Sequence, residues 1–460
     1  MAVGFPALAI PVDFLSALIL PRRNPDSRRR GPQKKCSSRS ASGHSRVVLL
    51  RNSQSALWDA IVDGESSDRV DYHGARLHAV VTEPVGDPAG RIERAIALAK
   101  KLGDAARKVG AAHRYPSRIR FGIDYGSCLA MSTGRSHEKD ILFLGRPANH
   151  AAKLAAQSNE EGIFLTDTAQ RHLAPSAFRK SMGQVALEEA YVRSATQRYQ
   201  FDRLSKAADS LSDPRISTPV FQFHRATPPL AEVKFGDLTP SNSVRMGMAS
   251  IFADIDGYTN FVDAATRGGS IEIRKAVETI HVIREELNSV LREDFGGKRV
   301  RFIGDCIQGC IAEGEQQDNP KAAIKEAAMC AAAMQSSFGL CLKIVKPGAA
   351  IDLAIGIEYG PTPLTRIGDA GDDSVRCAAS RATVGAERVQ QQIEGGGVRL
   401  GSAAVELADF SVRKHFGSGR LMSYDSAADL LGAVSSPVVH VVREQPAARM
   451  LALGDPRRRV

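Results

Sequence analysis

The stretch that decides the fold of this chain is residues 251–262, IFADIDGYTNFV, where an apolar strand ends at two carboxylates and a glycine. Asp254 and Asp256 alternate along this strand, so their side chains are predicted to point to the same face. A second apolar segment, 300–311, contains Asp305 at a predicted hairpin turn. Carboxylates that meet at strand ends can form an oxygen-ligand site for Mg²⁺ or Mn²⁺, although each could also simply cap a turn.

Working outward, two blocks of the chain, 45–204 and 244–442, resemble each other. The first contains RIRFGIDYG at 118–126 and the second contains DLAIGIEYG at 352–360, and both are alternating strands that end in glycine. In each block a helix of small residues and another strand follow. This repeat predicts a duplication and an α+β fold, with two tandem domains in which helices pack on a sheet.

Helices between these strands are predicted from apolar residues at spacings of three and four, which places them on one face. One such stripe is Ile92, Ala95, Ile96, Ala99 and Leu102. The other is Ile271, Val277, Ile280, Ile283, Leu287 and Leu291. We expect both stripes to face the core.

Composition predicts where the two domains begin and end. Residues 1–44 are rich in Arg, Ser and Lys and are expected to form a basic, disordered leader. The apolar segment 2–20 within it is interrupted by prolines and an aspartate, so it fits neither a signal peptide nor a membrane span. The proline-containing stretch 205–243 is predicted to be an interdomain linker. Residues 443–460 form a basic tail.

The bulk composition narrows the class of protein and its compartment. The chain has 460 residues, 43% hydrophobic and 24% charged, with a net charge of +10. Much of this positive charge lies in the two ends and no nucleic-acid-reading motif accompanies it, so we expect no nucleic-acid partner. Seven scattered cysteines, an odd number, favour free thiols in a reducing cytoplasm.

The residues FADIDGYTNFV together with RFIGDCIQG resemble the two metal-binding motifs of the class III adenylyl and guanylyl cyclases. The resemblance covers much of the second block. It implies that Asp254, Asp305 and the backbone carbonyl of Ile255 bind two divalent ions, Mn²⁺ or Mg²⁺. The backbone amides that it implies for the triphosphate are those of Gly257, Tyr258 and Thr259.

In this family an Asn and an Arg, one helical turn apart, come from the partner domain and contact the reacting phosphate. The second block has Val384 at the Asn place and keeps Arg388. The first block has Asn149 and Lys153 at these places, within LGRPANHAAKL, but Ala75 where the hairpin Asp should be. The losses are complementary, so the resemblance implies a pseudo-heterodimer with one composite active site and one degenerate site.

Additional phosphate contacts are less well defined. The strand that offers an Arg in this family has Ala354 in the second block. Arg301 or Lys298 could substitute for it, and Arg193 near the end of the first block could reach the β- or γ-phosphate.

The resemblance also points to the residues that contact the base. The family's two base-reading positions hold Asp71 and Leu142, with Tyr72 beside the first, and this fits neither purine pattern. A carboxylate can accept a hydrogen bond from uracil N3 or guanine N1, whereas the ring edge of adenine has no such donor. Bacterial cyclases of the Pycsar antiphage type are similar in having unorthodox base positions. We therefore expect a uridylate cyclase, with guanylate, adenylate or cytidylate cyclase as alternatives.

A hypothesis of another class stays open at this point, namely a catalytically inactive cyclase-fold protein that binds nucleotide and regulates a partner. Val384, Ala354 and Ala75 favour it, whereas the Asp254, Asp305 and Asn149 set opposes it. If the chain is a cyclase, its product would be a second messenger for a separate effector protein. The tandem could close its own site, or two chains could form a homodimer by exchanging domains.

Overall fold

A computed structural model describes most of the chain. The described residues are 9–21, 67–73, 76–112, 117–133, 140–157, 161–181, 184–213, 222–228, 230, 233–367, 375–417 and 419–431. The chain divides into two compact units. The first unit is Leu8–Phe221 with Ile367–Val375, and the second unit consists mainly of Gln222–Arg366 and Arg376–Val460.

The second unit is built on a mixed sheet with the strand order β11-β12-β10-β13-β14, to which β15 adds beside β13 and β9 beside β10. The central strand, β10, is antiparallel to β12 and β13, and most of its residues are buried. The strands are β9 (Phe223–Arg225), β10 (Ser243–Asp256), β11 (Lys298–Ile303), β12 (Cys306–Ile311), β13 (Asp352–Ile367), β14 (Val375–Ala378) and β15 (Gly397–Leu400).

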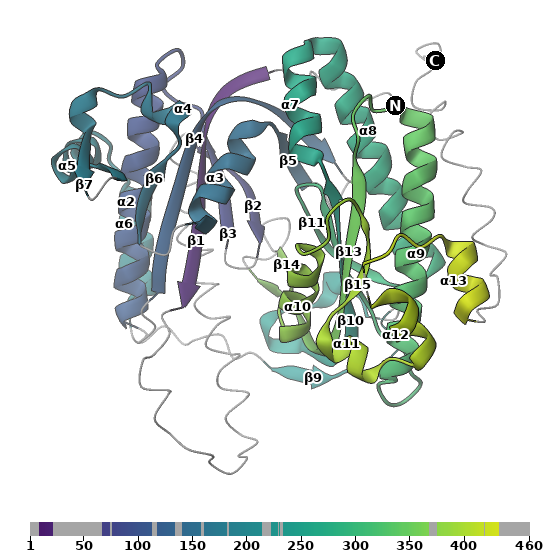
Figure 1. The fold of residues 1–460 in the computed structure, drawn as a ribbon. Coiled ribbons are helices and arrows are strands. Elements are labelled where there is room, and N and C mark those ends of the chain that lie inside the picture. The colour runs from purple at the N-terminus through teal and green to yellow at the C-terminus, as the bar shows by residue number, and fades with distance from the viewer. Residues whose placement is uncertain are drawn as a thin grey trace, which may run out of the picture. The chain divides into compact units, whose positions relative to one another are not determined.

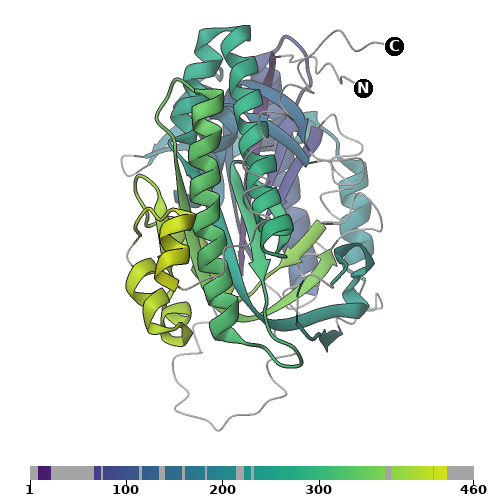
Figure 2. The ribbon, with the colours of Figure 1, turned by 90° about the vertical axis from the view of Figure 1, so that its right-hand side faces the viewer.

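Helices cover both faces of this sheet. The long helices α8 (Ser270–Ser289) and α9 (Pro320–Val345) pack against each other on one face (Figure 2). The short helix α10 (Arg381–Gln390) covers the other face (Figure 1). Among the described residues α9 is the one helix long and apolar enough to cross a membrane, but it packs on β10 and β12 as a core helix. The remaining helices are α7 (Tyr258–Gly268), α11 (Ser402–Leu407), α12 (Phe410–Phe416) and α13 (Tyr424–Leu431).

The first unit repeats this topology. Its sheet has the order β2-β3-β1-β4-β5 with β6 beside β4, which matches the sheet of the second unit except for β9. The strands are β1 (Ala9–Pro21), β2 (Ser67–His73), β3 (Arg76–Val81), β4 (Ser117–Thr133), β5 (Asp140–Leu144) and β6 (Gly162–Leu165), and β7 (Phe178–Ser181) pairs with β8 (Gln184–Leu187) apart from this sheet. The helices are α2 (Pro88–Ala112), α3 (Arg146–Gln157), α4 (Asp167–Gln170), α5 (Glu189–Arg198) and α6 (Asp202–Leu211).

The expectation of a disordered leader over residues 1–44 is wrong for Ala9–Pro21. This segment is strand β1, and it lies between β3 and β4 with antiparallel pairing on both sides. A strand at the centre of a sheet has a neighbouring strand on each side, and such buried strands are typically short apolar runs. The position of β1 in the sheet therefore explains why this segment is apolar. Residues 22–44 and 443–460 lie outside the described part of the chain.

The linker predicted for residues 205–243 is also partly structured. Helix α6 continues to Leu211 and buries Leu204 and Ala208 in the core of the first unit. Strand β9 joins the second sheet in parallel with β10. The prolines predict an irregular structure for this stretch. In the structure its first part packs in the first unit and its last part packs in the second unit.

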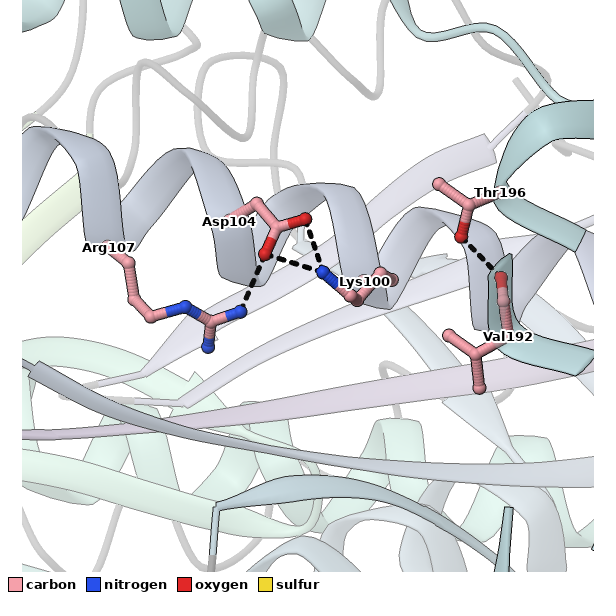
Figure 3. A network of polar contacts seen from close by, with 5 residues as sticks. All are labelled: Lys100, Asp104, Arg107, Val192 and Thr196. Carbon is pink, nitrogen blue, oxygen red and sulfur yellow. Dashed lines mark hydrogen bonds and ion pairs between the residues drawn. The ribbon is translucent and has the colours of Figure 1, made fainter. Parts of the chain in front are cut away.

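Helix α2 confirms the first predicted apolar stripe. All five stripe residues are buried, whereas the exposed side of α2 carries a charged network (Figure 3). Asp104 accepts hydrogen bonds from Lys100 at 2.6 Å and from Arg107 at 2.7 Å. Exposed pairs of this spacing contribute about 0.3–0.5 kcal/mol each, so burial of the apolar side dominates the stability of α2. The second stripe is confirmed in part, because Ile271, near the start of α8, is 69% exposed.

Candidate active site

The two carboxylates predicted as metal ligands converge in the second unit. Asp254 lies near the end of β10, and Asp305 lies in the tight turn that joins β11 to β12. The turn requires Gly304, whose φ of 61° is in the left-handed region that favours glycine. The side chains of Asp254 and Asp305 lie close together, because each contributes to the pKa shift of the other. The fold therefore brings together two acids that are 51 positions apart.

Burial makes this pair electrostatically unusual. Desolvation, reinforced by the nearby charge of Asp256, raises the pKa of Asp254 to about 6, although a hydrogen bond from Gln390 opposes the shift. Desolvation and the charge of Asp254 raise the pKa of Asp305 well above its ordinary value. Two buried carboxyls that cannot readily ionise together are a site where a cation can replace the shared proton.

The residues present fit a divalent cation held jointly with a phosphate ligand. Two carboxylates, with the carbonyl of Ile255 beside them on β10, supply hard oxygen ligands of the kind that Mg²⁺ and Mn²⁺ prefer. Within the described ranges no cluster of three or more His, Cys, Asp and Glu side chains could hold a metal on its own. Mg²⁺ commonly binds through one or two carboxylates together with substrate phosphates and water.

These pKa shifts predict how pH and Mn²⁺ act on stability. The folded pKa of Asp254 is about 6 and its ordinary value is 3.8, so between these values the folded state holds more protons than the unfolded state. The metal-free protein should therefore lose stability as pH rises through this window. If Mn²⁺ binds the ionised pair, it should raise the melting temperature clearly at about pH 8 and little at about pH 5. Scanning calorimetry with and without Mn²⁺ measures this, and an equal shift at both pH values would contradict it.

The third carboxylate, Asp256, has a structural role at the end of β10. Its carboxylate accepts hydrogen bonds from the backbone N–H of Gly257 and of Gly395, both at 2.9 Å. Gly257 has a φ of 79°, and a Cβ there would lie 2.8 Å from the carbonyl oxygen of Ala350. Helix α7 begins directly after this turn, at Tyr258 and Thr259. The backbone N–H of Gly257 already donates to Asp256, so the expectation that this amide binds the triphosphate does not fit the described structure.

The transition-state residues predicted in the first unit lie on helix α3. Asn149 is half-buried and Lys153, one turn later, is exposed. The helix lies directly on β4, because a Cβ at Gly122 would be 2.1 Å from the carbonyl oxygen of Ala151. Glycine at this position of the repeated strand therefore fixes how closely the helix that carries Asn149 and Lys153 approaches the sheet.

Strand register shows what replaces the metal ligands in the first unit. When the repeated strands are aligned in sequence, Arg120 corresponds to Ala354. Leu18 pairs with Arg120 in the first sheet, and Asp254 pairs with Ala354 in the second sheet, so Leu18 corresponds to Asp254. The segment ALILPRRN at 17–24 thus corresponds to ADIDGYTN at 253–260. Sequence reasoning missed this correspondence because the two carboxylates that identify the motif are both leucines here. The turn residue Ala75 lies outside the described residues, but its neighbours in β2 and β3 are paired as in the second unit.

The remaining predicted residues are placed as follows. Asp71 and Tyr72 lie on β2, with Asp71 opposite His78, and Leu142 lies on β5 opposite Met131. The structure describes their backbone positions, whereas their side chains lie outside the description. These three positions stay predictions for the base-contacting residues.

The two arginines predicted as phosphate contacts, Arg301 and Arg193, lie on β11 and on α5. Arg301 is buried on β11, and its Nη2 donates a hydrogen bond to the backbone carbonyl of Arg376 on β14. Arg193 is exposed on α5, which packs on α2. Helix α2 faces the side of β4 that carries Phe121, whereas α3 covers the side at Gly122. The sheet of the first unit therefore lies between Arg193 and Lys153, and the phosphate contact of Arg193 stays a prediction.

The six cysteines in the described residues are free and buried. Cys306 directly follows Asp305, and burial, with the charges of Asp254 and Asp305 adding to it, raises the pKa of its thiol. This thiol is therefore a buried packing group beside the acidic pair.

Comparison with known proteins gives consistent results. Residues 34–202 match the model of the adenylate and guanylate cyclase catalytic domain. The chain is 40% identical to a uridylate cyclase from a Rhizobium species, over 86% of this chain and 79% of that protein. It is 34% identical to a uridylate cyclase from Pseudomonas aeruginosa, over 84% and 78%. A crystal structure of a class III adenylyl cyclase-like ATP-binding protein from Pseudomonas aeruginosa is similar over 92% of this chain and 91% of that one, with a TM-score of 0.79 and 31% identity.

Proposed function

Because this chain belongs to the class III adenylate and guanylate cyclase family, we propose that it converts UTP to 3′,5′-cyclic UMP and pyrophosphate. The observation that carries the proposal is the complementarity of the two units. The second unit holds the acidic pair Asp254 and Asp305, and the first unit holds Asn149 and Lys153 where the second has Val384 and Arg388. We propose that one composite active site forms from these two halves, as a pseudo-heterodimer within the chain.

In the proposed reaction the ribose 3′ oxygen loses its proton and forms a bond to the α-phosphorus. The bond between the α-phosphorus and the oxygen that bridges to the β-phosphorus breaks, and pyrophosphate leaves. Two bound Mn²⁺ or Mg²⁺ ions would supply charge neutralisation and lower the pKa of the 3′ hydroxyl. Asp254 and Asp305 would hold these ions, and the first turn of α7, at Tyr258 and Thr259, would bind the triphosphate. Asn149 and Lys153 stabilise the negative charge that develops on the α-phosphoryl oxygens.

Selection of uracil rests on Asp71 and Leu142. In the proposed site the carboxylate of Asp71 accepts a hydrogen bond from uracil N3–H, whereas cytosine N3 and adenine N1 are acceptors and would repel it. The side chain of Leu142 would fill the space beside the base. Support for uracil also comes from the two relatives named uridylate cyclase, which match most of this chain.

A second candidate function is nucleotide binding without catalysis. The similar structure from Pseudomonas aeruginosa is described as an ATP-binding protein. Lys153 also differs from the family's Arg, and a point charge contacts phosphate less specifically than a guanidinium fork. In this case the protein would bind a nucleoside triphosphate and transmit the binding to a partner.

One assay separates these functions. Purified full-length protein is incubated with Mn²⁺ and each of ATP, GTP, CTP and UTP, and the products are resolved by mass. We expect cyclic UMP from UTP, and we expect Asp71→Asn to lower the kcat/KM for UTP by about 10-fold or more, since a lost charge-assisted hydrogen bond contributes about 1.5–3 kcal/mol. A cyclic purine would keep the chemistry and overturn the role of Asp71. Binding without any cyclic product would favour the second candidate.

The same proposal sets the biological context. Cyclic UMP would act as a second messenger made in the cytoplasm, read by a separate effector protein in antiphage defence. Two chains could also exchange units and form a homodimer with two composite sites.

A further inference from the structure

The metal-ligand candidate Asp254 has a neutral partner on the helix that covers it. Gln390, the last residue of α10, donates a hydrogen bond from its Nε2 to Oδ2 of Asp254 at 3.2 Å. Gln390 is 8% exposed, so this contact is shielded from solvent. A carboxylate held by one oxygen in this way has a fixed orientation and keeps its other oxygen for a cation.

The close approach of α10 to the sheet makes this contact possible. A Cβ at Gly356 on β13 would lie 2.1 Å from the carbonyl oxygen of Ala386 and 2.6 Å from the backbone nitrogen of Gln390. The helix backbone therefore lies directly on β13, and the glycine is what allows it. From this position the side chain of Gln390 reaches β10, the strand next to β13.

A small residue lies opposite Asp254 on β13. Asp254 pairs in register with Ala354, so the two side chains lie on the same face of the sheet. Gly356, two residues further along β13, also lies on this face, which is the face that α10 covers. Ala354 is 1% exposed. A long side chain at position 354 would fill the space between α10 and β10. The small side chain of Ala354 leaves this space for the side chain of Gln390.

The first unit provides an internal comparison. Its helix α3 lies on Gly122 in the same way that α10 lies on Gly356. The residue of α3 that corresponds to Gln390 is Ala155, whose backbone nitrogen would lie 2.9 Å from a Cβ at Gly122. The strand position that corresponds to Asp254 holds Leu18, opposite Arg120. The second unit therefore combines the amide donor Gln390 with the carboxylate Asp254. The first unit has alanine and leucine at these two positions.

We propose that Gln390 is a positioning residue that orients Asp254 for the divalent cation, an inference that rests on the proposed cyclase function. Loss of an outer hydrogen-bond partner typically lowers metal affinity by about 10–100-fold. Gln390→Leu should therefore raise the Mn²⁺ dissociation constant by this factor. The kcat at saturating Mn²⁺ should change much less, because Gln390 itself touches neither substrate nor reacting atoms.

The test measures Mn²⁺ binding to the full chain directly, from the electron paramagnetic resonance signal of free Mn²⁺, with 3′-deoxy-UTP present as a ligand that cannot cyclise. The matched control is Gln391→Leu, since Gln391 is the exposed next residue and its Nε2 lies 3.5 Å from Oε1 of Glu387. We expect the dissociation constant to stay within about 2-fold of wild type in the control. Equal Mn²⁺ affinity in Gln390→Leu and wild type would overturn the proposal.

A second variant keeps the test decisive if Gln390→Leu fails to fold. Gln390→Glu keeps the shape of the side chain but replaces the amide donor to Asp254 by a carboxylate, so its Mn²⁺ affinity should differ from that of wild type by about 10-fold or more. Unchanged affinity in this variant would also overturn the proposal. If wild type binds Mn²⁺ but forms no cyclic nucleotide, the proposed function fails while the effect of Gln390 on Mn²⁺ affinity is still measured.

Discussion

Replacing Asp305 by Asn should abolish cyclase activity while leaving the metal-free fold as stable as wild type or more stable. The carboxylate supplies a negative ligand to the proposed cations, and metal catalysis of this kind contributes several kcal/mol to transition-state stabilisation. Since each 1.36 kcal/mol is a factor of ten, we expect kcat to fall by about 10³-fold or more.

The opposite effect on stability follows from the buried acidic pair. Burial and the charge of Asp254 raise the pKa of Asp305, which means that its ionised form is disfavoured in the folded state. Asn keeps the shape and removes that cost, so the melting temperature without metal should not fall, and the gain from Mn²⁺ should disappear. Product formation and calorimetry on the same preparation measure both effects.

A matched control for Asp305→Asn is Asp409→Asn. Asp409 is an exposed carboxylate of the second unit that forms a surface ion pair with Lys321 at 3.2 Å. Exposed pairs contribute about 0–1 kcal/mol, so activity and Mn²⁺ stabilisation should remain. If Asp305→Asn kept near-wild-type activity, the acidic pair could not be the metal site, and the catalytic part of the proposed function would fall.

Lys153→Ala should lower kcat by about 10²–10³-fold with a small change in KM. Removal of one preformed donor to a developing negative charge costs this much, because the contact strengthens in the transition state. Lys153 is exposed on α3, so the substitution should not unfold the first unit. Steady-state kinetics with UTP and Mn²⁺ measure the two constants, and Lys153→Arg should keep much of the activity.

The chain contains its own control for this substitution. Arg388 is exposed at the equivalent place of α10 in the second unit, which has Val384 where the first unit has Asn149. Arg388→Ala should leave kcat within about 3-fold of wild type, because an exposed arginine outside the proposed composite site contributes little. Equal losses in Lys153→Ala and Arg388→Ala would contradict a single composite site and would indicate two equivalent ones.

A mixing experiment with these variants reports on assembly. Asp305→Asn damages the second unit and Lys153→Ala damages the first, so each variant retains one intact half. If two chains exchange units, a mixture of the variants refolded together should recover activity, since one of the two sites in a mixed dimer combines intact halves. If each chain closes its own site, the mixture should stay inactive.

The sequence by itself determined the acidic half of the site and the repeat. The acidic motif is local: Asp254 lies near the end of a strand, Gly257 permits the left-handed turn after it, and Gly304 permits the turn that presents Asp305. Such short-range requirements are visible in the residue types because glycine and the alternation of apolar residues carry them directly. The repeated strand that ends in glycine likewise identified the helices that carry Asn149 and Val384.

Only the tertiary structure decided how distant segments pair. The sequence of β1, with leucines at the carboxylate positions, predicts a leader because it carries no signal of the partner strands β3 and β4. Pairing between strands that are far apart in the sequence depends on the whole sheet. The face of the sheet on which Arg193 lies and the contact of Gln390 with Asp254 also depend on which helix covers which face. Local periodicity shows that a helix has an apolar side, whereas packing decides what that side meets.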